Sequence, residues 1–235
     1  MALPRPERPE YSTTIPSSGK KIKYQPFTVR EEKTLVLAAE SQDPDEIANA
    51  VGNCIKNCVT SPSDLNINEL ALFDIEYLFL KTRAKSVGEK IELSLTDPDD
   101  ETFTTKVSIN VDKISVVRDK GHTDLIDIGG DIQVKMRYPD INFFTKGLDL
   151  QSVDSGSEII AECISSIVSG EEVYARVDMA QGEIEEWVSA LSTEQFRKIM
   201  NFFLTMPKLS HTVKAKNTVT GNDFSVTLEG LSDFF

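Results

Sequence analysis

The segment from Asn68 to Glu89 constrains the fold more than any other part of the chain. Its apolar residues share two helical faces: Leu70, Phe73, Tyr77, Leu80 and Ala84 on one, and Leu72, Ile75 and Phe79 on the other. A helix that is apolar on so many sides is usually buried against several neighbours. It ends in three basic residues before Gly88, as expected where cations meet the negative end of a helix and glycine ends it. We therefore expect a central, largely buried helix.

The composition describes an acidic globular chain with enough apolar residues for a core. Its 235 residues are 40% hydrophobic and carry a formal net charge of −13. This charge argues against nucleic acid and anionic membranes as partners, because phosphate contacts need clustered lysine and arginine. No apolar run approaches the roughly 18 residues of a membrane span, and residues 1–10 lack the apolar core of a secretory signal. Three cysteines, an odd and small number, favour a reducing compartment.

Hydrophobic periodicity predicts an α+β fold with an N-terminal helical part, a central mixed β region, and a C-terminal helix and hairpin that pack back. The expected segments are an extended proline-rich arm over 1–30, a helical region over 31–88, a β region over 89–150, an α-rich region over 151–208, and a C-terminal β-hairpin with an aromatic tail over 209–235. Within them we expect one strand from Asp124 to Pro139 with a bulge at Gly129-Gly130. Residues 152–157 are expected to be a linker, and residues 158–168 a helix.

Residues 1–30 hold five of the ten prolines, which predicts extended backbone. Two interpretations remain open: a disordered tail, or an arm that becomes ordered on a neighbouring subunit. Apolar anchors are unusual in disordered tails and favour the second interpretation; they are Tyr11, Ile15, Ile22, Tyr24 and Phe27. A pure docking arm predicts that removal of residues 1–25 abolishes assembly without unfolding the rest.

Two predicted hairpins, at 91–111 and 211–228, have similar lengths and similar closing strands. Hairpins often look alike, so this similarity is chance by default. The more specific hypothesis is that the two pack together as one small β module that joins distant parts of the chain.

Residues with catalytic or metal-binding chemistry are sparse, and we predict no catalytic, cofactor-binding or metal-binding residue. His122 and His211 have no ligand or nucleophile signature beside them, and Cys54 and Cys58, four apart on a predicted helix, fit packing better than metal binding. The acidic turn over 97–101 lacks the spacing and closing glutamate of a calcium loop. The adjacent carboxylates at 74 and 76 cannot share a helix face, so they are a poor acid and base pair.

Several motifs, in order along nearly the whole chain, carry a resemblance to a known family. They are Ile15–Lys20, Pro26–Lys33, Phe73–Leu80 with Arg83–Glu89, Met136–Pro139, Phe202–Leu209 and Leu228–Phe235. Together they resemble the baseplate hub subunit or baseplate hub assembly protein family of T-even-type contractile-tailed phages, including marine relatives. Some members of that family carry paired CxxC knuckles in two hairpins, which suits a zinc ribbon. The matching turns here, over 96–99 and 217–220, lack cysteine, so the resemblance implies a ribbon-like hairpin pair without metal.

The resemblance implies a non-enzymatic tail protein that takes part in baseplate hub assembly, either as a hub subunit or as an assembly chaperone. Its expected partners are other hub or tape-measure proteins, or further copies of itself, and its expected location is the host cytoplasm during assembly and the virion tail baseplate. Buried aromatic residues are the usual anchors of interfaces. The residues predicted to lie at an interface are Ile15, Pro16, Tyr24, Phe27, Phe234 and Phe235. The alternative class is a tail-tip enzyme such as a small hydrolase, for which the sequence offers no acid and base pair.

Overall fold

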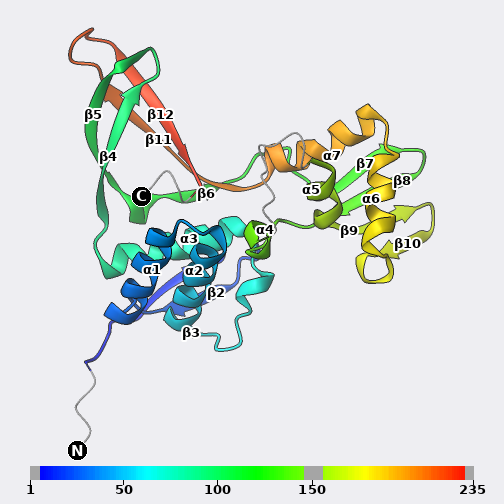
Figure 1. Cartoon of the computed structure of the whole chain (residues 1–235), viewed down its shortest axis with the longest axis horizontal. Coiled ribbons are helices and arrows are strands. Elements are labelled where there is room, and N and C mark those ends of the chain that lie inside the picture. Colours follow the sequence, from blue (N-terminus) through cyan, green and yellow to red (C-terminus); the bar gives the residue numbers. More distant parts are fainter. Residues whose placement is uncertain (1–5, 146–155, 231–235) are drawn as a thin grey trace, which may run out of the picture. The chain divides into compact units, whose positions relative to one another are not determined.

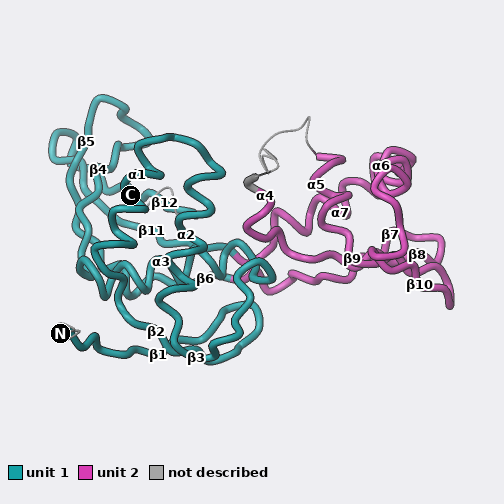
Figure 2. Tube along the Cα trace, turned by 60° about the horizontal axis from the view of Figure 1, so that its bottom comes forward, with its two compact units in different colours: residues 1–117, 208–235 teal, residues 118–207 magenta. Residues whose placement is uncertain are grey.

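The computed structural model describes residues 6–145 and 156–230. The chain divides into two compact units, which Figure 2 distinguishes by colour. Unit 1 comprises residues 1–117 and 208–235, and unit 2 comprises residues 118–207. Helices and strands are both abundant in short sheets, so the predicted α+β class is confirmed. The unit boundary near 207 falls one residue from an expected segment boundary, whereas the expected boundary at 88 lies inside unit 1.

Unit 1 consists of three helices, a small N-terminal sheet and two β-hairpins (Figure 1). Its elements are β1 Tyr11–Thr14, β2 Lys21–Tyr24, α1 Val29–Ser41, α2 Pro44–Cys58, β3 Val59–Ser61, η1 Ile67–Glu69, α3 Leu72–Ser86, β4 Lys90–Asp97, β5 Asp100–Asn110, η2 Val111–Lys113, β6 Ser115–Val117, β11 Lys208–Lys216 and β12 Asp223–Glu229. Lys208 pairs with Val117 across β6 and β11. Unit 2 is therefore an insertion between two paired strands of unit 1.

The N-terminal residues form a hairpin rather than the extended arm that their prolines suggested. Strands β1 and β2 pair antiparallel, and β2 also pairs with β3, which gives a three-stranded sheet. The prolines flank this hairpin or lie in its turn, where the missing amide hydrogen costs no ladder bond. Ile15 and Ile22 are each only 1% exposed. Burial of these side chains within the same chain accounts for the order of the segment without a neighbouring subunit.

Helices α1 and α2 begin at the polar residues that cap them. Thr28 caps α1 in a capping box with Glu31, whose carboxylate accepts from the Thr28 amide at 2.9 Å. Asp43 caps α2 by accepting from the amide of Asp45 at 2.8 Å. Asn66 caps the short helix η1, and α3 begins six residues later at Leu72 without a side-chain cap. Each capping bond satisfies an amide that the first turn leaves unpaired.

Helix α3 is buried on most of its circumference, as its apolar pattern predicts. Its buried residues are Phe73, Asp74, Ile75, Leu78, Phe79, Leu80, Thr82 and Ala84. One side of α3 contacts α2, and Leu80 and Ala84 enter a cluster formed with the two long hairpins. The N-terminal sheet, the helices and the hairpins of unit 1 are thus joined through one helix.

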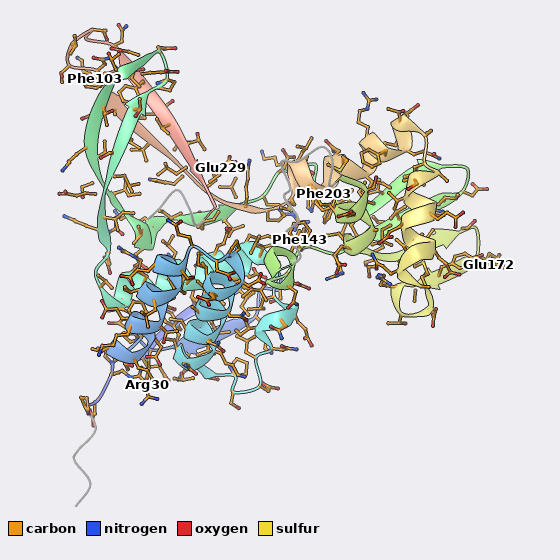
Figure 3. All side chains as sticks on the ribbon, viewed as in Figure 1. Arg30, Phe103, Phe143, Glu172, Phe203 and Glu229 are labelled. Atoms are coloured by element: carbon orange, nitrogen blue, oxygen red, sulfur yellow. The ribbon has the colours of Figure 1, made fainter. Side chains whose placement is uncertain are left out.

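The two hairpins pack together as a β module, defined here as β4, β5, β11 and β12. Its core contains Ile91, Leu95, Ile109, Leu209, Val213, Phe224 and Leu228. Phe103, near the far end of β5 in Figure 3, packs edge-on against Phe224 with ring centroids 6.4 Å apart. These contacts link segments more than a hundred residues apart in the sequence.

A buried hydrogen-bond junction joins the turns of the two hairpins. The Asn217 side chain is 0% exposed, and its Nδ2 donates to the Asp97 carboxylate at 2.8 Å. Its Oδ1 accepts from the amides of Val219 and Thr220 at 2.9 and 3.1 Å. The Asp97 Oδ1 in turn accepts from the Asp99 amide at 3.0 Å. The Asn217 side chain therefore closes the turn of its own hairpin and binds the turn of the neighbouring hairpin at Asp97.

Unit 2 contains a four-stranded antiparallel sheet in the order β10-β9-β8-β7, together with helices that cover it. Its elements are β7 Leu125–Gly129, β8 Ile132–Met136, α4 Asn142–Thr145, α5 Gly156–Cys163, β9 Ile164–Ser169, β10 Glu172–Ala175, η3 Arg176–Asp178, α6 Gln181–Ser189 and α7 Thr193–Thr205. The core is rich in isoleucine and phenylalanine, and Trp187 packs against it. Ser192 caps α7 in a capping box with Gln195.

Two predicted elements of unit 2 differ from the structure. The strand expected from Asp124 to Pro139 is a hairpin, because Gly129, Gly130 and Asp131 all take positive φ angles and reverse the chain. The helix expected over 158–168 ends at Cys163, and Ile164–Ser169 pairs with β8 as a strand. The first error took the turn at Gly129-Gly130 for a bulge within one strand. The second involves a short apolar run whose periodicity does not separate helix from strand. Most of the predicted linker at 152–157 lies outside the described residues.

We expect Asn217→Ala to destabilise the β module by about 2–3 kcal/mol, because the buried Asp97 carboxylate and two turn amides lose their partner. Amide hydrogen exchange of β4 and β11 would measure this as a lower free energy of opening. Thr218→Ala, at the exposed neighbouring position, should change it by less than about 0.5 kcal/mol. Equal exchange in N217A and the wild type would contradict a stabilising junction.

Candidate interaction site

Two of the predicted interface residues, Ile15 and Pro16, belong to the turn between β1 and β2. Pro16, Ser17, Ser18 and Gly19 are all exposed, whereas Ile15 at their base is buried. The Ile15 amide donates to the Lys20 carbonyl at 2.9 Å, and the Gly19 amide donates to the Ile15 carbonyl at 2.9 Å. Gly19 has φ +69°, a conformation that favours glycine. We name residues 16–19 the hairpin tip.

Asp74 on α3 holds the hairpin tip in place. Its carboxylate is 0% exposed and accepts from the Ser17 amide at 2.9 Å and from the Ser17 hydroxyl. Burial raises the pKa of Asp74 above its ordinary value, and the bonds from Ser17 oppose this by favouring the ionised form. A buried carboxylate with two donors from one serine fixes both the position and the orientation of the turn.

The same face of α3 continues along β1. The Tyr77 hydroxyl and the Thr13 hydroxyl lie 3.0 Å apart, and the Lys85 ammonium lies 5.4 Å from the centre of the Tyr11 ring. Asp74, Tyr77 and Lys85 follow one another along one face of α3. Their partners, Ser17, Thr13 and Tyr11, follow in the reverse order of the sequence. Lys85 also pairs with Glu89 and Asp112, and these hydrogen bonds raise its pKa. The hairpin is therefore attached to α3 along three successive helical turns.

Two of the predicted interface residues are placed in the core of the chain itself. Ile15 is 1% exposed and Tyr24 is 4% exposed, so neither side chain is offered to a partner. Burial raises the pKa of Tyr24 to about 12. The physical reason is that alternate residues of the hairpin face the helices, and an apolar side chain on that face lowers the free energy of this chain alone.

Of the other four predicted interface residues, the structure describes Pro16 and Phe27. Pro16 is exposed at the hairpin tip, as an interface residue requires. Phe27 is half-buried, and its amide donates to the Ser86 hydroxyl at 2.9 Å. Phe234 and Phe235 lie outside the described residues. The N-terminal segment thus meets α3 at both of its ends, with Ser17, next to Pro16, bound to Asp74 near the start and Phe27 bound to Ser86 at the last residue.

The cysteine pair and the acidic turn make contacts that belong to the fold of unit 1. Cys54 and Cys58 are free and buried, and their mutual contact together with burial raises the pKa of the Cys54 thiol. Asp97, in the acidic turn, belongs to the junction with Asn217. Within residues 6–145 and 156–230, no group of three or more His, Cys, Asp or Glu side chains is arranged to hold a metal ion. His211 lies on β11 opposite Leu228.

His122 is a buried hydrogen-bonding residue of unit 2, and it is 8% exposed. Its Nδ1 lies 3.0 Å from the Thr205 hydroxyl, which itself donates to the Asn201 carbonyl at 2.8 Å. Since that hydroxyl has one hydrogen, Nδ1–H donates to Thr205, and Nε2 accepts from the Tyr138 hydroxyl at 2.9 Å. Burial, and secondarily the charge of Arg118, lowers the pKa of His122. Burial therefore favours the neutral imidazole, in which Nδ1 carries the hydrogen.

A shallow groove of about 540 Å³ lies beside His122, between α7 and the loop before β7. It is lined by Gly121, Thr123, Ile126, Arg197, Lys198, Met200, Asn201, Phe202, Leu204 and Thr205. Leu204 is 74% exposed. The two cations at this groove, Arg197 and Lys198, contrast with the acidity of the whole chain.

Sequence reasoning missed the two polar anchors, Asp74 and His122. A sequence signal for Asp74 existed: a carboxylate placed directly between Phe73 and Ile75, on a helix that is apolar on most sides, is expected to be buried and to need a partner. His122 had no local signal: its partners Tyr138 and Thr205 are 16 and 83 residues away. Only the fold brings these three side chains together.

Comparison with known proteins identifies the family of the chain. A family model described as T4 bacteriophage base plate protein matches residues 8–235, nearly the whole chain. The chain therefore belongs to this family of phage baseplate proteins. Neither the curated proteins nor the solved structures include a significant match. In the part of the chain that the structure describes, no helix has the length and apolar character to cross a membrane.

We expect Asp74→Ala to lower the free energy of opening of the N-terminal hairpin by about 2–3 kcal/mol, because the Ser17 amide and hydroxyl lose their acceptor. Asp74→Asn should cost much less, since its amide oxygen still accepts and its amide nitrogen donates to the hydroxyl. Hydrogen exchange of the Ile22 and Tyr24 amides measures this opening. Trp187 fluorescence should be unchanged in both variants, because the only tryptophan lies in unit 2.

Because the pKa of Asp74 is raised in the folded state, the stability of the N-terminal hairpin should depend on pH in a definite direction. The folded state binds the Asp74 proton more readily than the unfolded state, so lowering the pH through the folded pKa should stabilise the wild-type hairpin. D74N carries no titrating group at position 74, so its hairpin should not gain this stability as the pH falls. An identical pH response in D74N and the wild type would refute the assignment.

His122 predicts the opposite pH dependence for unit 2. Its folded pKa lies below the ordinary value of 6.5, so the unfolded state binds more protons and stability falls as the pH drops below about 6.5. Denaturant unfolding monitored by Trp187 fluorescence measures this loss. His122→Gln should be less stable at neutral pH but should have a flatter profile between about pH 5 and 7. A wild-type profile as flat as that of H122Q would show that His122 is not the titrating group.

Proposed function

We propose that this chain is a non-enzymatic protein of the phage tail that takes part in building the baseplate hub, as a hub subunit or an assembly chaperone. The observation that carries the proposal is the family match over residues 8–235. The hub role is supported by the resemblance of ordered motifs such as Ile15–Lys20 and Phe202–Leu209. The partners are other hub or tape-measure proteins, bound through protein–protein contacts.

The arrangement of the titratable groups supports a binding role over a catalytic one. Asp74, His122 and Cys54 are buried groups with shifted pKa values, and the partners that the structure gives each of them lie in the same unit. Asp74 attaches a turn, His122 links Tyr138 to Thr205, and Cys54 packs against Cys58. Their shifted pKa values follow from structural burial, which perturbs titration as an active site does.

The hairpin tip and the edge beside it are the proposed contact surface. Asp74 fixes the tip, so Pro16 and its neighbours are presented in one conformation and lose little entropy on binding. Phe27, half-buried beside the last residue of α3, is a second proposed contact residue. Phe234 and Phe235, which lie outside the described residues, remain proposed contact residues from the sequence. A few exposed or half-buried anchors of this kind suit a protein interface.

The acidity of the chain favours a partner with a basic or neutral face. Its net charge of −13 steers basic surfaces toward it and repels acidic ones. A chaperone that shields a basic client and a subunit that meets a basic neighbour share this requirement. The two roles differ in whether the protein remains in the particle.

Quantitative mass spectrometry of purified virions and of infected-cell lysate distinguishes these roles. Several copies per virion would establish a hub subunit, whereas abundance in lysate with absence from virions would establish a chaperone. A tail-assembly defect should follow loss of the protein in either case. Normal, infectious tails made without it would overturn the proposal.

We expect Pro16→Glu to reduce incorporation of the protein into tails or tail intermediates without lowering its thermal stability, because the substituted side chain is exposed. Thr34→Glu adds the same charge at an exposed position of α1 and is the matched control. The readout is the amount of each variant in purified tails relative to wild type. Equal incorporation of P16E and T34E would remove the hairpin tip from the contact surface.

A further inference from the structure

Helix α1 of unit 1 exposes most of its apolar side chains to solvent. Val29 and Leu37 are each 66% exposed and Val36 is 51% exposed, whereas Ala38 is buried. A surface helix usually turns its apolar residues toward the core of its own chain. Several exposed apolar residues on one helix instead mark a surface that another molecule can cover. Arg30, labelled in Figure 3, lies in the first turn of this helix.

These apolar residues share one face of α1 with two charged residues. An α-helix turns about 100° per residue, so side chains spaced three, four or seven residues apart lie on the same side. Five exposed residues fall within one arc of about 100° by this rule. The set, named here the outer face of α1, is Val29, Lys33, Val36, Leu37 and Glu40. The buried Ala38 lies on the opposite side of the helix.

The two charges of the outer face have opposite signs and lie at equal distances from its apolar centre. Lys33 precedes Val36 by three residues, and Glu40 follows Leu37 by three residues. Within the described residues, neither the Lys33 ammonium nor the Glu40 carboxylate has a hydrogen-bond or ion-pair partner. By contrast, the Glu31 carboxylate on another side of α1 accepts from the Thr28 amide. Lys33 and Glu40 are therefore both available to pair with a second molecule.

The outer face is complementary to itself under a two-fold rotation. When α1 packs antiparallel on α1 of a second copy, with the axis between Val36 and Leu37, Lys33 lies opposite Glu40 of the second copy. The rotation repeats this pair, so opposite charges meet twice, on either side of an apolar centre. A parallel arrangement would instead place Lys33 against Lys33 and Glu40 against Glu40. Charge complementarity therefore selects a second copy as the partner and the antiparallel direction.

We propose that two copies of this chain associate by antiparallel packing of their α1 helices, with Val36 and Leu37 at the two-fold axis and Lys33 paired with Glu40 of the second copy. Burial of the apolar centre favours the contact, and the two charge pairs set its direction. Two-fold symmetric contacts of this kind are the commonest in homo-oligomers. The proposal is independent of the hub assignment, because it concerns the isolated chain.

Sedimentation velocity of the full chain tests the proposal. The outer face is only about 17 Å long at about 1.5 Å per residue, so the contact is small and the association should be weak. The protein concentration should run from about 1 μM to about 0.5 mM, at about 0.15 M salt to screen the net charge. We expect the weight-average mass to rise from that of a monomer toward that of a dimer. A mass that stays monomeric over the whole range would overturn the proposal.

Glu40→Lys is the decisive variant, because it separates the local charge pair from the net charge. The substitution raises the formal net charge of −13 by two, so a general loss of repulsion would strengthen association. The proposal requires the opposite, because two ammonium groups would then meet at each end of the contact. We expect association at least about fivefold weaker than wild type. Association of E40K equal to or stronger than wild type would overturn the proposed pairing.

A charge exchange tests whether the partner is a second copy. Lys33→Glu should weaken association as Glu40→Lys does, because two carboxylates would then meet at each end. An equimolar mixture of K33E and E40K should associate more strongly than either variant alone, since both pairs again join opposite charges. The double variant K33E/E40K should recover the association of the wild type to within about threefold. A mixture that associates no more strongly than the separate variants would overturn the proposal.

The apolar centre has its own test. Leu37→Glu places two carboxylates beside the two-fold axis and should keep the protein monomeric up to about 0.5 mM. Thr34→Glu adds the same charge to α1 outside the outer face and should associate within about threefold of wild type. The thermal midpoint by far-UV circular dichroism shows that each variant is folded, as expected for substitutions of exposed side chains. Association of L37E equal to that of T34E would overturn the contact.

Discussion

Unit 1 depends on one helix that has no free side. Helix α3 uses its apolar residues against α2 and, through Leu80 and Ala84, against the β module. Its one polar face, with Asp74 and Tyr77, holds the N-terminal hairpin. Each neighbour of α3 is a small element that could not bury enough apolar surface by itself, so its order depends on contact with this helix.

Polar groups fix the positions that apolar packing leaves free. Apolar contacts are non-directional, so they bring the two hairpins together without setting the register of their turns. The hydrogen bonds of Asn217 to Asp97 are directional and buried, and they define how the turns meet. Ser17 with Asp74 and His122 with Tyr138 do the same elsewhere.

Much of the secondary structure could be predicted from the sequence. Helix α3, the capping box at Ser192 and the pair of long hairpins all follow from short-range patterns that the structure reproduces. Prediction failed at the N-terminal segment, where proline content outweighed the alternation around Ile15 and Ile22. It also failed at Ile164–Ser169, because the choice between helix and strand there depends on pairing with β8.

The sequence by itself determined the α+β class, the central buried helix, the acidity and the family, because periodicity, charge and ordered motifs are properties of the chain. The tertiary structure alone decided which residues are available to a partner. It placed Ile15 and Tyr24 inside, kept Pro16 outside, and left the outer face of α1 exposed. The physical reason is that burial depends on contacts between residues distant in sequence, such as Ser17 with Asp74, which no local pattern encodes.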